Sequence, residues 1–264
     1  MEMIHQAIAS RLDLSHVKKP PIGFSPETIW MIEKGFEGKN VVLKFSRRIE
    51  VYEEGQIYRF LKDKIPVPEV YLNECHDGIH YLLMEMVDGK MLQEILFTHP
   101  VDGILEIYAN LVKRIHQIPV DQFPFDHGLA YKRAKVKQCV INDLVNVTQF
   151  EREFKGKSAS ELYSMLKNIP PFQEDLVFCH GDVCMPNFIY NENGLQAVLD
   201  VSGAGINDRY LDLAIALRTL RYNFELYGLS FGEKEVSRFL ALYGVALDRE
   251  KLLYYILLDE LMVG

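Results

Sequence analysis

The sequence predicts an α+β protein of two lobes, in which a small lobe with an antiparallel sheet and one helix precedes a larger, mostly helical lobe. Two observations predict this division. Apolar and β-branched residues form short strand-like runs before residue 87, whereas the chain after Gly89 follows mostly the 3.6-residue period of amphipathic helices. The change falls at Val87-Asp88-Gly89. We therefore expect an N-terminal lobe over residues 1–86 and a C-terminal lobe over residues 87–264.

The first lobe is expected to contain four strands and one helix. Turn-forming residues at 34–40 separate the first two strands, and His76-Asp77-Gly78 separates the last two. An apolar stripe at helical spacing predicts the helix, which Pro66 ends. The expected strands cover residues 24–32, 41–45, 70–72 and 80–86, and the expected helix covers residues 50–64.

The second lobe is expected to be built mainly from helices, with a few short strands around loops. The first of its helices shows a clear 3.6-residue period and ends before Pro119. The expected helices cover residues 104–118, 132–145, 160–169, 211–220, 233–243 and 249–262. The expected strands cover residues 176–178, 188–190 and 197–201.

Composition and charge narrow the class of protein. The 264 residues are 48% hydrophobic and 25% charged, which is an ordinary globular profile and excludes a disordered or collagen-like chain. The formal net charge is −8. Because an acidic chain repels a phosphate backbone, nucleic acid is not expected as a partner, and a cationic ligand suits the chain better.

The sequence predicts a cytoplasmic protein without a membrane partner. No apolar run approaches the ~18 residues that a membrane span needs, and the first residues lack the basic and apolar regions of a signal peptide. The four cysteines form no C-x-x-C pair and do not suggest a disulfide framework. Cys179, His180 and Cys184 lack the second ligand pair of a structural zinc site.

Four features that carry chemistry follow one another along the chain. Lys44 ends an apolar strand, and Glu54 lies on the helix that follows. Asp182, in His180-Gly181-Asp182, precedes Asn187 by five residues, and Asp200 follows a second apolar run. Protein kinases combine a strand lysine, a helix glutamate, a D-x-x-x-x-N loop and a metal-binding aspartate in this order.

Each residue type has a reason to be present in a phosphoryl-transfer site. Lys44 supplies a positive charge for nucleotide phosphates, and Glu54 can hold that lysine by an ion pair. Asn187 and Asp200 offer the oxygen ligands that Mg²⁺ prefers. Asp182 can align an acceptor hydroxyl or accept its proton.

Each residue alone also has an ordinary structural interpretation. Lys44 and Glu54 could be solvated surface charges, Asp182 and Asn187 could be turn residues, and Asp200 could cap a loop. The ordered set on the right elements favours the catalytic interpretation over these alternatives.

The motifs resemble those of the aminoglycoside phosphotransferases. Residues 176–187 resemble the catalytic loop of that family, and residues 199–214 resemble its metal-binding segment. The tail at residues 254–261, which reads YYILLDEL, is similar to the C-terminus of the 3′-phosphotransferase branch. The resemblance covers nearly the whole chain and is strongest after Leu176. Because choline kinases share the catalytic motif, the tail and residues 208–214 are what indicate the branch.

The resemblance implies a protein-kinase-like fold and a phosphotransferase that confers antibiotic resistance. The enzyme would move the γ-phosphate of ATP or GTP, with Mg²⁺, to a hydroxyl of an aminoglycoside, and the branch implies the 3′-hydroxyl. By matching position, Lys44 and Glu54 would bind the phosphates, Asp182 would be the catalytic aspartate, and Asn187 and Asp200 would bind magnesium.

Further positions match the nucleotide and substrate sites of that family. Ser25 matches a loop that touches the nucleotide phosphates, and Met84 and Met86 match a hinge that meets the base. Carboxylates suit a polycationic substrate because they form charge-assisted hydrogen bonds with ammonium groups. The positions expected to contact the substrate are Asp182, Glu151, Arg218, Asp259 and Glu260.

The chain departs from the family pattern at two places. Ser202 and Gly203 stand where members usually have Gly-Arg, so the arginine beside the catalytic aspartate is missing. Residues 131–160 carry seven basic and three acidic side chains, a net charge of +4 where an acid-rich insert is expected. Arg152 stands where an acid is common, whereas the neighbouring Glu151 keeps one.

These departures keep two alternatives open. One is a kinase of another small hydroxylated metabolite, such as an amino alcohol or amino sugar. The other is a non-catalytic relative that binds a nucleotide or a drug. A protein kinase is less favoured, because no D-F-G motif followed by A-P-E occurs. The sequence leaves the choice between ATP and GTP open.

Overall fold

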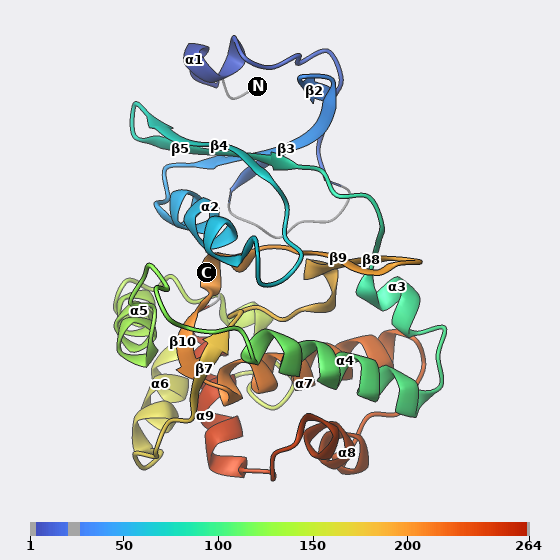
Figure 1. Ribbon diagram of the computed structural model, residues 1–264. Coiled ribbons are helices and arrows are strands. Elements are labelled where there is room, and N and C mark those ends of the chain that lie inside the picture. The colour runs from blue at the N-terminus through green and yellow to red at the C-terminus, as the bar shows by residue number, and fades with distance from the viewer. Residues whose placement is uncertain (1–3, 21–26, 263–264) are drawn as a thin grey trace. The chain divides into compact units, whose positions relative to one another are not determined.

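The computed structural model describes residues 4–20 and 27–262, and its contacts divide the chain into two compact units. Met1–Met91 and Asn187–Ser202 make up the first, and Leu92–Pro186 and Gly203–Gly264 make up the second. The first unit holds an antiparallel sheet and the second is mostly helical, which confirms the predicted α+β class (Figure 1). The division into a nucleotide-binding lobe over residues 1–86 and a catalytic lobe over residues 87–264 stays a prediction.

The first unit is built on a five-stranded antiparallel sheet with the strand order β1-β2-β3-β5-β4. Its strands are β1 (Val17–Lys18), β2 (Thr28–Phe36), β3 (Lys39–Ser46), β4 (Val70–His76) and β5 (Ile79–Glu85). The predicted turn over residues 34–40 is wrong in length. Glu37 and Gly38 alone, both with positive φ, connect β2 to β3 as a two-residue hairpin.

Alternation along β3 decides which side chains face which side of the sheet. Val41, Leu43 and Phe45 belong to the hydrophobic core on one face. Because successive side chains of a strand point to opposite faces, Lys44 points to the other face. A one-residue shift in register would exchange the two sets, so burial of the apolar set fixes the position of the lysine.

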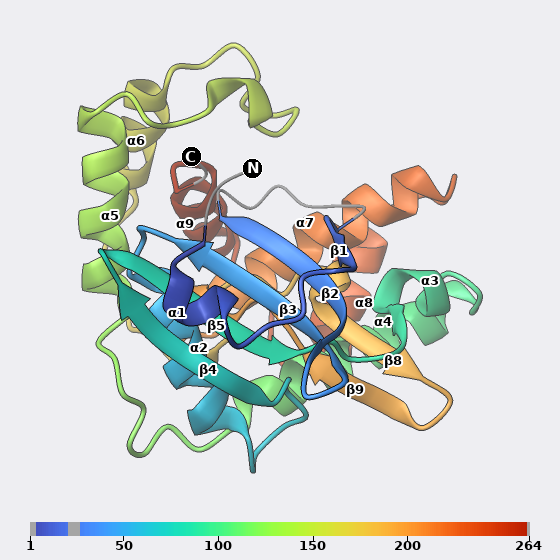
Figure 2. The same ribbon diagram turned by 90° about the horizontal axis from the view of Figure 1, so that it is seen from above.

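A helix covers each face of this sheet. The short α1 (Gln6–Ala9), which the sequence did not predict, buries Ile8 in the core that contains Leu43. The longer α2 (Glu50–Leu61) packs on the opposite face with its apolar stripe inward, and Figure 2 shows α1 and α2 on the two sides of the strands. It ends three residues earlier than predicted.

A second, three-stranded sheet belongs to the same unit. It has the order β6-β8-β9, formed by β6 (Lys90–Met91), β8 (Phe188–Asn191) and β9 (Gly194–Val198). The Val198 amide donates to the Pro66 carbonyl at 2.9 Å, which ties β9 to the segment after α2. The predicted strand through residue 201 is too long, because residues 201–203 turn into a 3₁₀ helix.

The second unit surrounds one short antiparallel pair, β7 (Leu176–Cys179) with β10 (Gly205–Asp208). No helix in the described part of the chain has both the length and the apolar character of a membrane span. The α7 helix exceeds its prediction by six residues at the C-terminal end, and α5 ends four residues early. The helices are α3 (Leu92–Leu96), α4 (Val101–His116), α5 (Leu129–Ile141), α6 (Ala159–Asn168), α7 (Tyr210–Leu226), α8 (Glu233–Tyr243) and α9 (Arg249–Glu260).

Candidate active site

A buried ammonium group lies between two carboxylates in the first unit. The Nζ atom of Lys44, on β3, is 2.8 Å from an oxygen of Glu54 on α2 and 3.2 Å from Oδ1 of Asp200. Lys44 and Glu54 are almost fully buried, whereas the side chain of Asp200 keeps 42% of its surface exposed. One of the two carboxylates is therefore open to a ligand.

The carboxylates keep Lys44 charged. Burial by itself lowers the pKa of a lysine, but Glu54 and Asp200 outweigh that effect and raise the pKa of Lys44 above its usual value. A permanently charged ammonium in a dry setting is suited to bind phosphate oxygens, because its field is little screened there.

Tyr58 connects the two acids and was missed by the sequence analysis. Its hydroxyl donates to Oε1 of Glu54 at 3.0 Å and accepts the backbone N–H of Asp200 at 2.9 Å. Asp200 has a φ of +52°, a region that non-glycine residues rarely adopt. Strain of this kind persists where the surroundings fix it, and the Tyr58 hydroxyl is one such restraint.

The sheet face that carries Lys44 also offers an apolar surface. Val42 and Met84 are cross-strand neighbours, and both are two residues from the Lys44–Leu82 pair, so they lie on that same face. The Met86 amide donates to the Asn40 carbonyl at 3.2 Å. Ser25, expected to touch the phosphates, lies outside the described residues.

Asn187 and Asp200 fit a divalent cation by their chemistry. Asn187 precedes β8 and Asp200 follows β9, and the Leu199 amide donates to the Asn187 carbonyl at 2.7 Å. The pair brings an amide oxygen and a partly exposed carboxylate to one hairpin of the first unit. Hard oxygen donors of this kind suit Mg²⁺.

In the second unit, the loop that contains Asp182 is anchored by a buried acid. The carboxylate of Asp212, on α7, accepts the amides of His180 at 2.7 Å and Gly181 at 2.8 Å. Nε2 of His116 lies 3.1 Å from the same carboxylate. Burial would raise the pKa of Asp212, but the hydrogen bond and charge of His116 dominate and lower it.

Two glycine backbones touch beside Asp182. Gly181 has a φ of +84°, and a Cβ atom there would lie 2.1 Å from the carbonyl oxygen of Gly203. The ammonium of Lys132, on α5, donates to that same carbonyl at 3.0 Å. Lys132 is nearly fully buried, and burial lowers its pKa. A lysine nitrogen therefore contacts the backbone of the position that lacks the family's arginine.

Asp182 and Cys184 are in contact in the loop that follows β7. The Cys184 amide donates to Oδ1 of Asp182 at 3.3 Å. Burial, followed by the charge of Asp182, raises the pKa of the Cys184 thiol, whereas the charge of Arg218 lowers it. The thiol is therefore neutral at pH 7, and it lies close to both charged groups.

The four acids at the end of α9 and in the loop before α6 are held by two arginines of α7. Nε of Arg218 bonds Oε1 of Glu151 at 2.6 Å, and its two terminal nitrogens pair with Asp259 and Glu260. Burial raises the pKa of Glu260, against the effect of Arg218. The remaining contacts are made by Arg221, which pairs with Glu151 and Glu153.

Comparison with known proteins places this chain among the phosphotransferases. The model of the family described as phosphotransferase enzyme family matches residues 16–253. The chain belongs to this family. An aminoglycoside 3′-phosphotransferase from Niallia circulans is 32% identical over 243 residues, which cover 90% of each chain.

Solved structures agree with this assignment. A crystal structure of an aminoglycoside 3′-phosphotransferase of type VIII superposes with a TM-score of 0.81 and 26% identity, and it covers 97% of this chain and 96% of its own. A Streptomyces rimosus aminoglycoside phosphotransferase in complex with ADP and streptomycin superposes with a TM-score of 0.73 and 22% identity, and the match covers 94% of this chain and 93% of that one. The phosphotransferase thus has the protein-kinase-like fold that the motifs implied.

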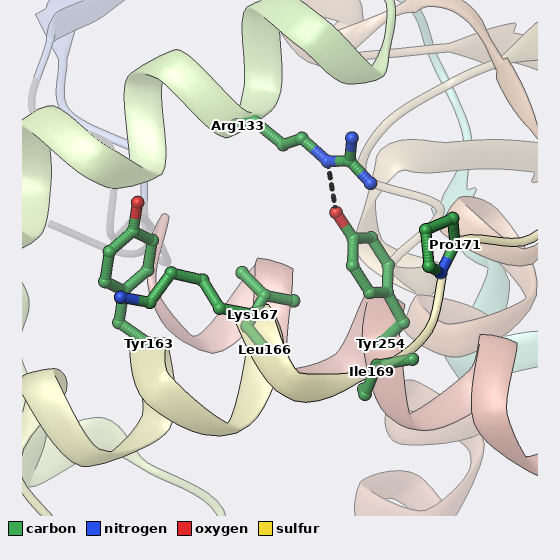
Figure 3. A pocket seen from close by; sticks show the side chains of 7 residues that line it. All are labelled: Arg133, Tyr163, Leu166, Lys167, Ile169, Pro171 and Tyr254. Carbon is green, nitrogen blue, oxygen red and sulfur yellow. Dashed lines mark hydrogen bonds between the residues drawn. The ribbon is translucent and has the colours of Figure 1, made fainter.

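Two other features of this phosphotransferase stand apart from the predicted site. A cavity of about 320 Å³ opens between α5, α6 and α9. Nε of Arg133 donates to the Tyr254 hydroxyl at 2.6 Å, the hydrogen bond marked in Figure 3. The cavity contains none of the predicted residues. The ligand atoms of His116, Cys179 and Asp212 lie within 4.8 Å of one another, but His116 is paired with Asp212, and the Cys179 thiol donates to the Asn207 carbonyl on β10.

The structure brings seven of the predicted residues together in two groups. Lys44, Glu54 and Asp200 meet in the first unit, and Arg218 joins the acids in the second. The sequence analysis missed the supporting residues, which had weaker signals. Asp212 is a charge inside an apolar helical run, which suggests a buried role. Arg221 follows Arg218 by three residues and so shares its helix face.

The approach of Gly181 to Gly203 generates the first prediction. Gly181→Ala should lower the free energy of unfolding by about 1–3 kcal/mol more than Gly156→Ala, because backbone must move to admit the methyl group. Gly156 is a matched control, since its φ is +85° with open space around it. Urea denaturation at pH 7 measures both. Equal losses would show that conformation alone, without the contact, explains the glycine.

Asp212 generates a prediction with a pH dependence. Asp212→Asn should lower the free energy of unfolding by about 3 kcal/mol at pH 7, because two amides and His116 lose a charged acceptor. The lowered pKa means that this contribution is present above pH ~3.8 and disappears as the pH falls through the folded-state pKa. Urea denaturation at pH 7 and at the lowest pH where both proteins fold tests this. A difference that grows on acidification would contradict it.

Proposed function

We propose that this phosphotransferase transfers the γ-phosphate of ATP or GTP to a hydroxyl, the 3′-hydroxyl, of an aminoglycoside antibiotic and thereby confers resistance. The observation that carries the proposal is the Lys44–Glu54–Asp200 cluster, a charged, buried ammonium beside a partly exposed carboxylate. The similarity to aminoglycoside 3′-phosphotransferases supports the choice of substrate. A nucleoside triphosphate as co-substrate and four cysteines without a disulfide both favour a location in the cytoplasm.

In this proposal the lobe of residues 1–86 binds the nucleotide. The ammonium of Lys44 contacts the phosphates, and Glu54, held by Tyr58, fixes the direction of that ammonium. Val42 and Met84 give the base an apolar surface. Met86 contacts the base, and Ser25 contacts the phosphates. ADP in the streptomycin complex of the Streptomyces rimosus relative supports a nucleotide co-substrate.

Asn187 and Asp200 would hold Mg²⁺. The ion, when bound, neutralises charge on the phosphate oxygens during transfer. Asp200 keeps its orientation through the hydrogen bond that its backbone N–H donates to the Tyr58 hydroxyl and through the Ser202 hydroxyl, which lies 3.4 Å from Oδ1.

Asp182 acts on the acceptor in the lobe of residues 87–264. Its carboxylate accepts the hydrogen of the substrate hydroxyl, which aligns the oxygen and takes its proton as the bond to phosphorus forms. The nucleoside diphosphate leaves with the electrons of the broken phosphorus–oxygen bond. Asp212 holds the loop rigid, so the position of Asp182 costs little ordering during the reaction.

The acids of the second unit recognise the substrate by charge. Glu151, Asp259 and Glu260 bind ammonium groups, while Arg218 spaces the three carboxylates. Charge-assisted hydrogen bonds to ammonium groups are stronger than neutral ones, which favours a substrate with several amino groups.

One observation favours a second candidate, a kinase of a smaller amino alcohol or amino sugar. The acids are already paired with Arg218 and Arg221, so a substrate with one or two ammonium groups meets less competition than a polycation. The non-catalytic alternative has weaker support, since the chain contains all the residues proposed to contact the phosphates, the metal and the substrate hydroxyl.

A substrate panel tests the proposed function. With Mg²⁺ and either ATP or GTP, kanamycin or neomycin should stimulate release of nucleoside diphosphate, and omission of Mg²⁺ should abolish it. Choline, ethanolamine and glucosamine serve as the rival substrates. Turnover of these compounds with none on a broad aminoglycoside panel would favour the second candidate and contradict the first.

Asp182→Ala separates catalysis from binding. We expect kcat to fall at least ~10²-fold, as for the loss of a general base, because the hydroxyl loses its proton acceptor. The KM for nucleotide should change little, since Asp182 has no role there. An unchanged kcat would remove Asp182 from the mechanism.

A further inference from the structure

The acids expected to bind substrate already have internal partners. Both carboxylate oxygens of Glu151 are engaged, Oε1 by Arg218 and Oε2 by Arg221, and its backbone N–H lies 3.3 Å from both oxygens of Glu260. Asp259 and Glu260 pair with Arg218, and Glu153 pairs with Arg221. An ammonium group that enters this cluster has to displace a guanidinium or share a carboxylate with it.

The two arginines cancel half of the negative charge of the cluster. Four carboxylates face two guanidinium groups, which leaves at most two negative charges for a ligand. A substrate with many ammonium groups therefore gains less from this cluster than its four carboxylates alone suggest.

The two arginines differ in how they are held. Arg218 bonds three carboxylates, including the buried Glu260, and so fixes the arrangement of the acids. Within residues 4–20 and 27–262, Arg221 bonds only Glu151 and Glu153, and the side chain of Glu153 is 54% exposed. The pair of Arg221 with Glu153 can be broken at lower cost, since that carboxylate is open to solvent, whereas its second partner Glu151 is only 14% exposed.

We propose that Arg221 is a specificity-determining residue, an internal counter-ion that competes with the ammonium groups of the substrate for Glu151 and Glu153. The inference rests on the proposed function for the identity of the substrate. The charge competition itself follows from the contacts alone. It assigns to this enzyme a preference for substrates with fewer ammonium groups, because each further group has to compete with a cation already in place.

Removal of the competing cation should strengthen the binding of polycations. Arg221→Gln should lower the KM for neomycin about 2- to 5-fold, the range expected when a partly exposed ion pair no longer has to be broken. The KM for kanamycin, which has fewer amino groups, should fall less. The KM for nucleotide should stay within twofold, because the cluster has no role in nucleotide binding.

Arg249→Gln is the matched control. It removes the same charge from the same unit, where Arg249 pairs with the exposed Glu233 at 2.9 Å. Arg249 begins α9 and Glu260 ends it, about 16 Å apart along the helix axis. An equal fall in KM in this control would show that net charge, not the position of Arg221, is responsible and would overturn the proposal.

A second measurement keeps the inference separate from the proposed function. Binding of spermidine, a polycation that lacks an acceptor hydroxyl, is measured by calorimetry on the wild-type chain and on Arg221→Gln. Tighter binding by the variant supports the proposal even if no aminoglycoside is phosphorylated, which would contradict only the proposed function. Unchanged or weaker binding overturns it.

A conservative variant covers the case in which Arg221→Gln does not fold. Arg221→Lys keeps the charge but cannot bridge two carboxylates with a planar fork, so its pairs with Glu151 and Glu153 should be weaker. We expect it to bind spermidine and neomycin more tightly than wild type and Arg249→Gln do, but less tightly than a cluster without any cation at position 221. Weaker binding than wild type by the lysine variant would show that the arginine contacts the ligand and would contradict the proposal.

Discussion

The ion pairs of Lys44 are the constraint on which the proposed chemistry depends. An ammonium group is costly to bury, and it stays charged here because Glu54 and Asp200 compensate its desolvation. The alternation of β3 points Lys44 away from the apolar core, and α2 brings Glu54 to meet it. Fold and charge are thus coupled, because a one-residue shift of strand register would place Leu43 or Phe45 at this position instead.

A similar logic organises the second unit around Asp212. A fully buried carboxylate accepts hydrogen bonds from two consecutive amides of the loop and from His116. These hydrogen bonds restrict the backbone conformation around Gly181. The close contact between Gly181 and Gly203, whose carbonyl also accepts from Lys132, restricts the conformation further. Rigid support of this kind keeps Asp182 in place without any contact to substrate.

The sequence predicted the α+β class, the order of the main elements and the residues of the Lys44 cluster, because those depend on local periodicity and on residue types in a recognisable order. The supporting residues depend on contacts between distant segments, such as Tyr58 with Asp200 and Lys132 with Gly203. Periodicity carries no information about such pairs. The hairpin at Glu37 was misjudged because Lys34 and Gly35 have turn-forming character but lie in a bulged strand.

The central claim is that the ammonium of Lys44 acts on the transferred phosphate. The most direct test is the rate of nucleoside diphosphate release by Lys44→Met at saturating nucleotide and aminoglycoside, with thermal unfolding as the control for folding. The account predicts a fall of about 10²–10³-fold, the effect of removing one charge that stabilises the transition state. A rate within threefold of wild type, in a protein that unfolds at the same temperature, would contradict it.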